Sequence, residues 1–277
     1  MSFVTVGTEN SSAIGVYYED HGSGQPVILI HGYPLNGHSW EKQERALLEA
    51  GYRVITYDRR GFGRSTHTTT GYDYDTFAAD LKALIDHLSL SDVILVGFSM
   101  GTGEVVRYLS RYGSDRVSKA VLLGALQPFL LKTGDNPQGV DAEVFKKIEE
   151  AILDDRFAYF KNFLDNFYNV DVFGGKRISK EAWQNSFNVA ASSSAYATYA
   201  CVQAWLTDFR PDLPRIDVPV LVMHGSADRI LPISATSDRL PDLLGEVEYM
   251  VVDGGPHAIN WTHAEEVNSA LLGFLRG

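Results

Sequence analysis

The sequence has a single cysteine, Cys201, and no long apolar run. One cysteine excludes an internal disulfide, and we expect Cys201 to be a small buried hydrophobe. No stretch approaches the roughly 20 apolar residues that a membrane-spanning helix requires. Residues 1–10 lack the basic and apolar segments of a signal peptide. We therefore expect a cytoplasmic protein with no membrane partner.

Basic residues are also few. The 277 residues include 24 Lys and Arg against 35 Asp and Glu, which gives a net charge of -11. Because no basic run offsets this balance, the charge argues against a nucleic-acid partner.

The common motifs of cofactor and metal chemistry are missing as well. The sequence has no G-x-x-x-x-G-K-S/T, H-E-x-x-H or C-x-x-C, so nothing supports a phosphate-binding loop or a metal centre. Gly61 and Gly63 have no third glycine at Thr66, which leaves a dinucleotide fingerprint weak. We expect no cofactor and no metal.

The most informative stretch is residues 93–103. An apolar run ends in the motif G-F-S-M-G, centred on Ser99, and the residues after it have helical spacing. A G-x-S-x-G motif between a strand and a helix is typical of a nucleophile elbow. Such a turn forces the serine to a positive φ, and a Cβ at Gly97 or Gly101 would collide with the facing strand or helix. Ser99 is therefore the predicted nucleophile.

Strands and helices alternate along most of the chain. Short apolar runs predict strands, and amphipathic spacing predicts helices between them. The predicted strands span residues 16–20, 26–30, 53–57, 93–98, 119–123, 219–223 and 248–252. The predicted helices span residues 40–50, 74–88, 104–109, 233–244 and 263–275. This alternation predicts an α/β fold with a parallel sheet covered by helices on both faces, and places the first predicted strand at an edge.

The alternation stops between residues 127 and 214. This region has helical patterns, clearest at 141–154 and 181–191, and is rich in aromatic residues. We predict a helical cap inserted over one end of the sheet, with most of the rings packed in its own core. The predicted division is residues 1–126 and 215–277 for the α/β core and 127–214 for the cap.

A serine nucleophile needs a base and an orienting acid. In this architecture the acid and then the histidine follow the serine, each after a successive strand. His257, in a glycine-rich loop after the last strand, is the predicted base, and Asp228, in the turn after the preceding strand, is the predicted acid. Asp253 lies too near His257 in sequence to reach its Nδ1 easily. Residues 124–127, where such folds can also carry the acid, contain no carboxylate.

An oxyanion hole needs two backbone N–H groups aimed at one point. The predicted donors are Met100, at the start of the helix after the elbow, and Tyr33, in the loop after the second predicted strand. Gly32 lets this loop approach the nucleophile closely. His31 and His224 have simpler explanations as hydrogen-bonded core residues.

These motifs together resemble the α/β-hydrolase superfamily, and more closely the cofactor-free bacterial haloperoxidases. The motifs that carry the resemblance are His31-Gly32-Tyr33-Pro34, Asp58-Arg59-Arg60-Gly61-Phe62-Gly63-Arg64-Ser65, Gly97-Phe98-Ser99-Met100-Gly101, Gly225-Ser226-Ala227-Asp228 and Pro256-His257. This group, also called non-haem chloroperoxidases, includes aryl esterases, perhydrolases and γ-lactamases. The resemblance spans essentially the whole chain and implies an eight-stranded, mostly parallel sheet with a helical cap and no metal or haem.

The resemblance also implies roles for individual residues. Ser99, Asp228 and His257 would form a catalytic triad, and Tyr33 and Met100 would stabilise the oxyanion. The implied substrate pocket includes Gly32, Pro34, Trp205, Ile230, Ala258 and Ile259. The chain departs from the group at Tyr33, where tryptophan is frequent, and at residues 258–260, where glycine and an apolar residue are usual.

The implied activity is hydrolysis of a small carboxylic ester through an acyl-enzyme. With hydrogen peroxide in place of water, the product would be a peracid that oxidises halide in free solution. The fixed φ of Pro34 would shift the preceding carbonyl toward the nucleophile, and we hypothesise that this shift favours peroxide. Two alternatives stay open: another lid-bearing hydrolase (an esterase, a γ-lactamase or a carbon–carbon bond hydrolase) and a ligand receptor on this scaffold. Whether the chain forms a homo-oligomer is open as well.

Overall fold

A computed structural model describes residues 2–277 of the chain. Its centre is an eight-stranded sheet with the strand order β1-β2-β4-β3-β5-β6-β7-β8. The strands are β1 (Ser2–Glu9), β2 (Ser12–His21), β3 (Pro26–Ile30), β4 (Arg53–Tyr57), β5 (Val93–Phe98), β6 (Val117–Leu123), β7 (Val220–Gly225) and β8 (Val247–Val252). Strands β3 to β8 run parallel, whereas β2 pairs antiparallel with both β1 and β4.

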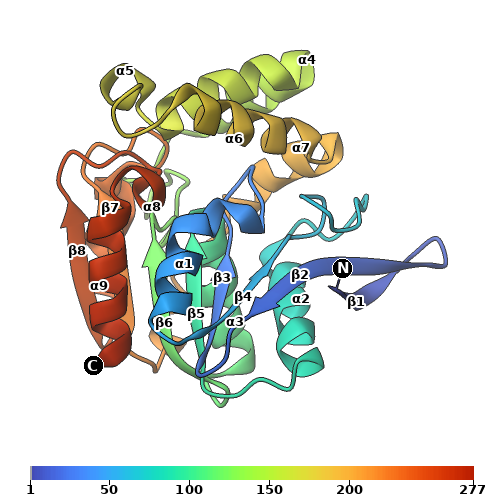
Figure 1. The fold of residues 1–277 in the computed structure, drawn as a ribbon. Helices are drawn as coiled ribbons and strands as arrows, with labels where there is room; N and C mark the ends of the chain where they lie inside the picture. The colour runs from blue at the N-terminus through green and yellow to red at the C-terminus, as the bar shows by residue number, and fades with distance from the viewer. Residues whose placement is uncertain (1) are drawn as a thin grey trace.

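Side chains of the parallel strands alternate between two separate cores. On β5, Ile94 and Val96 pack on one side with α1 and α9, whereas Val93 and Leu95 pack on the other with α2 and α3. These helices are α1 (Glu41–Glu49), α2 (Tyr74–His87), α3 (Met100–Tyr112) and α9 (Ala264–Arg276), with the short α8 (Ile259–Thr262) before α9. Figure 1 shows α1 and α9 in front of the sheet and α2 and α3 behind it. The predicted α/β fold class is confirmed, and burial on both faces explains the continuous apolar runs of the strands.

Four helices lie above the carboxyl ends of the parallel strands (Figure 1). They are α4 (Ala142–Phe167), α5 (Val170–Phe173), α6 (Lys180–Ser192) and α7 (Ala195–Ala204), and we call them the cap. Helix α4 is kinked at Asp155, whose φ of -148° and ψ of 95° are not helical. The Asp155 carboxylate accepts hydrogen bonds from the N–H groups of Phe157 and Ala158, so it restarts the helix as an N-cap residue would.

The strand predicted at residues 16–20 is not at the edge of the sheet. It is part of β2, which lies between β4 and the true edge strand β1. Of the eight residues of β1, Val4 alone is buried, so this strand lacks the apolar alternation that predicts strands. The sequence pattern therefore missed β1 because most of its side chains contact solvent.

The helix predicted at residues 233–244 does not form. The segment contains two 3₁₀ turns, η3 (Ile233–Ala235) and η4 (Ser237–Arg239), separated by Thr236 with φ -126° and ψ -104°. The Thr236 hydroxyl donates to the carbonyl of Pro232, and Pro241 has no N–H for a helical hydrogen bond. Two further 3₁₀ turns, η1 (Gly37–Trp40) and η2 (Leu213–Arg215), precede α1 and β7.

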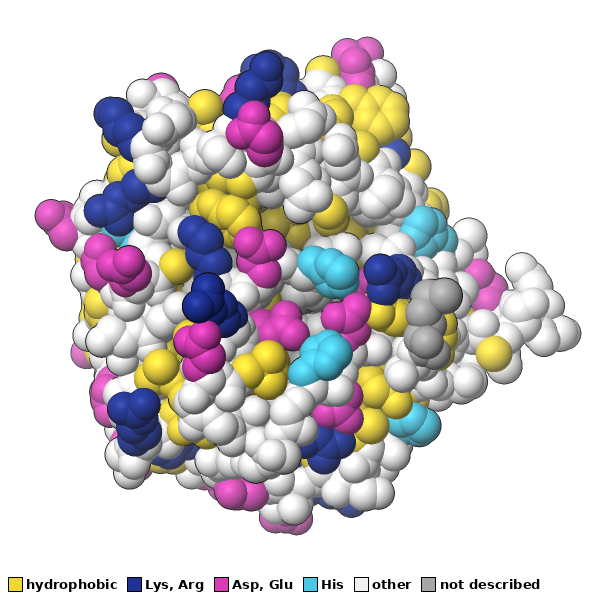
Figure 2. All heavy atoms as spheres, viewed as in Figure 1, with side chains coloured by type: hydrophobic (Ala, Val, Ile, Leu, Met, Phe, Trp, Pro, Cys, Tyr) yellow, Lys and Arg dark blue, Asp and Glu magenta, His cyan; other side chains and the backbone are white. Residues whose placement is uncertain are grey.

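The surface agrees with the low content of basic residues. Figure 2 shows one face, on which the described Lys and Arg side chains are interspersed with Asp and Glu instead of gathering in one patch. Among residues 2–277, none of the helices is both long enough and apolar enough to span a bilayer.

Cys201 provides a test of the cap packing. It lies on α7, is fully buried, and burial raises the pKa of its thiol to about 12. We expect a disulfide reagent such as dithionitrobenzoate to leave the native protein unmodified at pH 8, because the thiol is neither accessible nor ionised. One thiol per chain should react after denaturation in guanidinium. Fast, complete labelling of the native protein would mean that α7 does not pack as described.

Candidate active site

Ser99 occupies a strained turn between β5 and α3. Its φ is 53° and its ψ is -120°, a conformation that L-residues rarely adopt. A Cβ at Gly97 would lie 2.6 Å from the carbonyl oxygen of Gly101, and one at Gly101 would lie 2.3 Å from the carbonyl oxygen of Ile30. Because neither position tolerates a side chain, the two glycines allow the sharp turn that carries Ser99.

The structure brings Ser99, His257 and Asp228 into one hydrogen-bonded series. Nε2 of His257 lies 2.8 Å from Oγ of Ser99, and Nδ1 of His257 lies 2.6 Å from Oδ2 of Asp228. His257 follows β8 and Asp228 follows β7, so the three residues come from the carboxyl ends of three parallel strands. Because a carboxylate only accepts, Nδ1 carries the proton, and Nε2 accepts from the Ser99 hydroxyl.

The Asp228 carboxylate is held on both oxygens. Its Oδ1 accepts hydrogen bonds from the N–H groups of Ile230, at 2.7 Å, and Leu231, at 2.8 Å. Burial by itself raises the pKa of Asp228, but the charge of His257 and hydrogen bonds from His224 and His257 outweigh it and hold this pKa well below its usual value. The carboxyl therefore stays ionised at neutral and mildly acidic pH.

Asp253, the other carboxylate near His257 in sequence, lies elsewhere. It is exposed, and its Oδ1 is 3.4 Å from the hydroxyl of Ser226. Of the two aspartates, Asp228 alone contacts the imidazole of His257 among the described residues.

The backbone N–H groups of Tyr33 and Met100 are unpaired next to Ser99. Among residues 2–277, neither donates a hydrogen bond to another protein group, and both residues line the same cavity as Ser99. The loop that carries Tyr33 runs close to the turn at Ser99, since a Cβ at Gly32 would lie 3.0 Å from Cβ of Ser99. Both N–H groups are therefore free to bind an oxygen near Ser99.

His31 orients the peptide that contains the N–H of Tyr33. Nε2 of His31 accepts from the N–H of Arg59 at 2.9 Å, so its proton is on Nδ1, which lies 2.9 Å from the carbonyl oxygen of Gly32. The N–H of Leu35 donates to the same carbonyl oxygen at 3.1 Å. In a trans peptide the C=O and N–H point in opposite directions, so holding the Gly32 carbonyl also directs the N–H of Tyr33.

A buried ion pair ties this loop to the helix after Ser99. Arg59 pairs with Glu104 of α3, and both side chains are almost completely buried. The Arg59 guanidinium also donates to the carbonyl oxygen of His31 at 2.7 Å, and Tyr57 donates to Glu104. No sequence motif predicts this pair, because Glu104 is distant from Arg59 in the chain.

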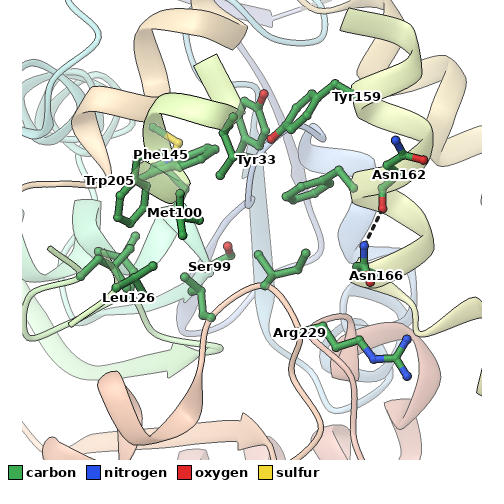
Figure 3. A pocket seen from close by; sticks show the side chains of 17 residues that line it. Tyr33, Ser99, Met100, Leu126, Phe145, Tyr159, Asn162, Asn166, Trp205 and Arg229 are labelled. Atoms are coloured by element: carbon green, nitrogen blue, oxygen red, sulfur yellow. Dashed lines mark hydrogen bonds between the residues drawn. The ribbon is translucent and has the colours of Figure 1, made fainter. Parts of the chain in front are cut away.

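A cavity of about 290 Å³ opens above Ser99, between the cap and the carboxyl ends of the strands. Figure 3 shows Ser99 facing a space bounded by Tyr33, Met100, Phe145 and Trp205. Most of the lining side chains are apolar, and α4 contributes seven of all the lining residues. The α4 residues that line it are Val144, Phe145, Ile148, Tyr159, Asn162, Phe163 and Asn166.

The predicted pocket residues divide into two groups. Trp205 and Ile230 line the cavity, whereas Gly32, Pro34, Ala258 and Ile259 do not. Gly32 packs on Phe98 and Ser99 below the cavity. Pro34 is buried in the turn closed by the hydrogen bond from Leu35 to Gly32.

Ala258 and Ile259 are covered by other parts of the chain. Both are fully buried, and the N–H of Ala258 donates to the carbonyl oxygen of Phe167 at the end of α4. The lining residues of α4 were not predicted, because a helical pattern rich in rings does not show which rings face the sheet. Among residues 2–277, no three His, Cys, Asp or Glu side chains lie close enough to hold a metal ion.

Comparisons with known proteins extend over the whole chain. Residues 25–264 match a family model described as alpha/beta hydrolase fold. The chain is 63% identical over 276 residues, covering 100% of both sequences, to a Synechocystis protein named "Putative non-heme chloroperoxidase". It is 34% identical to a bifunctional esterase/perhydrolase of Acinetobacter calcoaceticus, again covering 100% of both. A crystal structure of a bromoperoxidase from Bacillus anthracis superimposes with a TM-score of 0.95 at 42% identity, covering 100% of this chain and 99% of that one.

Proposed function

The chain belongs to the α/β-hydrolase family, and on this premise we propose that it is a cofactor-free serine hydrolase of the non-haem haloperoxidase type. It cleaves small carboxylic esters through an acyl-enzyme, and with hydrogen peroxide it forms peracids. One observation carries the proposal: the hydrogen-bonded series of Ser99, His257 and Asp228 begins at the floor of an apolar cavity. The strained φ of Ser99 places its hydroxyl at the tip of the turn.

The acylation step uses all three residues of the hydrogen-bonded series, Ser99, His257 and Asp228. The Ser99 oxygen attacks the ester carbonyl, and its proton passes to Nε2 of His257. Asp228 accepts the hydrogen bond from Nδ1 and stabilises the imidazolium. The N–H groups of Tyr33 and Met100 stabilise the negative oxygen of the tetrahedral intermediate, where preorganised donors contribute most to the rate. His257 then returns the proton to the departing alcohol, which leaves the acyl group on Ser99.

The molecule that attacks the acyl-enzyme in the deacylation step determines the product. When His257 deprotonates water, the acyl group leaves Ser99 as a carboxylic acid. When it deprotonates hydrogen peroxide, the same step releases a peracid. The peracid leaves the site and oxidises halide to hypohalous acid in solution, itself being reduced to the carboxylic acid. This route needs no bound halide, metal or haem, and the name of the Acinetobacter relative pairs the same two activities.

The cavity favours a neutral acyl group of modest size. Most of its walls are apolar, and Arg229 is the one cationic side chain among the described lining residues. The Arg229 guanidinium is already paired with both carboxylate oxygens of Asp171, at 2.7 and 3.1 Å. Tyr33 and Trp205 contact edge to face, with ring centroids 4.8 Å apart, and form an aromatic wall beside Ser99. The proposed partners are thus small molecules, and a cytoplasmic location stays a prediction.

The ion pair between Arg229 and Asp171 also argues against a carbon–carbon bond hydrolase that acts on dicarboxylates. A relative from Paraburkholderia phymatum with 30% identity is named for hydrolysis of a dienedioate. A pocket that binds the carboxylates of such a substrate needs free cationic side chains. The described lining residues offer only the paired Arg229.

Replacing Ser99 tests the nucleophile. Ser99→Ala should remove hydrolysis of p-nitrophenyl acetate almost completely, because comparable knockouts in a serine protease cost on the order of 10⁶-fold. A phosphonate or sulfonyl fluoride should label Ser99 alone, as read by peptide mass spectrometry. Full activity in the variant, or label on another serine, would contradict the assignment.

Two aspartate variants test the acid. Asp228→Asn should keep the fold, as checked by circular dichroism, but lower kcat by about 10⁴-fold, the cost of the same change in a serine protease. Asp253→Asn is the matched control and should change kcat by less than about twofold, because an exposed group away from the imidazole contributes little. If the two effects are reversed, the wrong acid has been chosen.

The peroxide reaction tests the haloperoxidase type. With acetate and hydrogen peroxide at mildly acidic pH, the enzyme should form peracetic acid and brominate a dye, and omitting the carboxylic acid should stop bromination. Ser99→Ala should lose this activity together with esterase activity, since both pass through one acyl-enzyme. Pro34→Leu should lower perhydrolysis more than hydrolysis. Equal losses of perhydrolysis and hydrolysis in Pro34→Leu would mean that Pro34 only shapes the loop. Bromination without any carboxylic acid would disprove the proposed route.

A further inference from the structure

A second histidine, which does not line the cavity, contacts the carboxylate of Asp228. His224 is on β7, four residues before Asp228, and its side chain is completely buried. Nε2 of His224 lies 2.9 Å from Oδ2 of Asp228 and 3.1 Å from the carbonyl oxygen of Leu231. Nδ1 lies 2.6 Å from the hydroxyl of Ser237, which is also completely buried. Both ring nitrogens of His224 are therefore engaged inside the protein.

These partners determine which nitrogen carries the proton. The carboxylate of Asp228 and the carbonyl of Leu231 only accept hydrogen bonds, so Nε2 of His224 must donate. Nδ1 is then the acceptor for the Ser237 hydroxyl. Ser237 thus holds the tautomer of His224 that donates to Asp228, just as Asp228 holds the tautomer of His257 that accepts from Ser99.

We propose that His224 and Ser237 are positioning residues for Asp228, and this inference rests on the proposed function of Asp228 as the catalytic acid. Oδ1 is fixed by two backbone N–H groups, and His224 fixes Oδ2, so the carboxylate has one orientation. In that orientation Oδ2 also accepts from His257 at 2.6 Å. Without His224 the carboxylate keeps its two hydrogen bonds at Oδ1 but loses the second donor that fixes Oδ2, and the imidazole of His257 is then less well aligned with Ser99.

The break between η3 and η4 brings Ser237 close to His224. The non-helical Thr236 places Ser237 at the start of η4, within hydrogen-bond distance of His224. Neither His224 nor Ser237 lines the cavity, so neither contacts a bound ester. Their replacement should therefore lower kcat and leave KM for p-nitrophenyl acetate unchanged.

Two amide variants of His224 separate positioning from packing. The amide nitrogen of glutamine can replace Nε2, whereas that of asparagine is close to Nδ1 and does not reach Asp228. His224→Gln should keep kcat within about threefold of the wild type. His224→Asn should lower kcat by about 10- to 100-fold, the effect of one hydrogen bond to a charged group. His263→Asn, at a buried histidine that contacts Thr262 instead, is the control and should keep wild-type kcat.

A double-mutant cycle shows whether His224 acts through Asp228. In the Asp228→Asn background, His224→Asn should cause no further loss, because the carboxylate that it positions is gone. Ser237→Ala provides a second test if His224→Asn folds poorly, and should lower kcat by about 3- to 10-fold with an unchanged KM, because His224 loses the donor that fixes its tautomer. Thermal unfolding of each variant identifies those that fold.

The outcomes distinguish this inference from the proposed function. Equal kcat values for His224→Gln and His224→Asn, or additive losses in the cycle, would overturn the positioning role while Asp228 keeps its assignment. Ser237→Ala with wild-type kcat would overturn the role of Ser237. If Asp228→Asn itself retains full activity, the proposed catalytic acid is wrong and the inference falls with it.

Discussion

The backbone at Ser99 is the constraint on which the surrounding structure depends. A positive φ at a serine costs about 1–3 kcal/mol and persists only where the neighbouring structure enforces it. Here the neighbours are the chain reversal from β5 into α3 and the loop after β3, which approach so closely that Gly97, Gly101 and Gly32 cannot carry a Cβ without a clash. The buried pair of Arg59 and Glu104 holds α3 against that loop. Ser99 and the N–H groups of Tyr33 and Met100, the proposed nucleophile and oxyanion donors, are thus positioned by one rigid assembly.

The cap contacts the loops that carry Asp228 and His257. The carbonyl of Phe167 accepts from the N–H of Ala258, next to His257, and the side chain of Asn169 donates to the carbonyl of Ala227, next to Asp228. The rings of Phe98 and Phe167 pack on the imidazole of His257, with centroids 5.1 and 5.2 Å away. The cap therefore helps to hold Asp228 and His257 in place. It also encloses the apolar cavity, where the exclusion of water strengthens charge interactions.

Much of the core could be predicted because its signals are local. An elbow is encoded by a few consecutive residues, and a strand buried on both faces is a continuous apolar run. The order of serine, acid and histidine along the chain follows from the succession of parallel strands. Where side chains face solvent, as in β1, or where hydroxyls and proline interrupt an apolar pattern, as at residues 233–244, the same signals failed.

The sequence by itself determined the fold class, the turn at Ser99 and the candidates Asp228 and His257, because each depends on residues close together in the chain. The tertiary structure alone decided which side chains enclose the cavity, since these come from α4, from the segments on either side of the cap helices, and from the loops after β3, β5, β6 and β7. It also decided that His224 donates to Asp228 and that Ser237 donates to His224. Such contacts depend on the distance and direction between packed elements, and no periodicity or motif in the sequence carries that information.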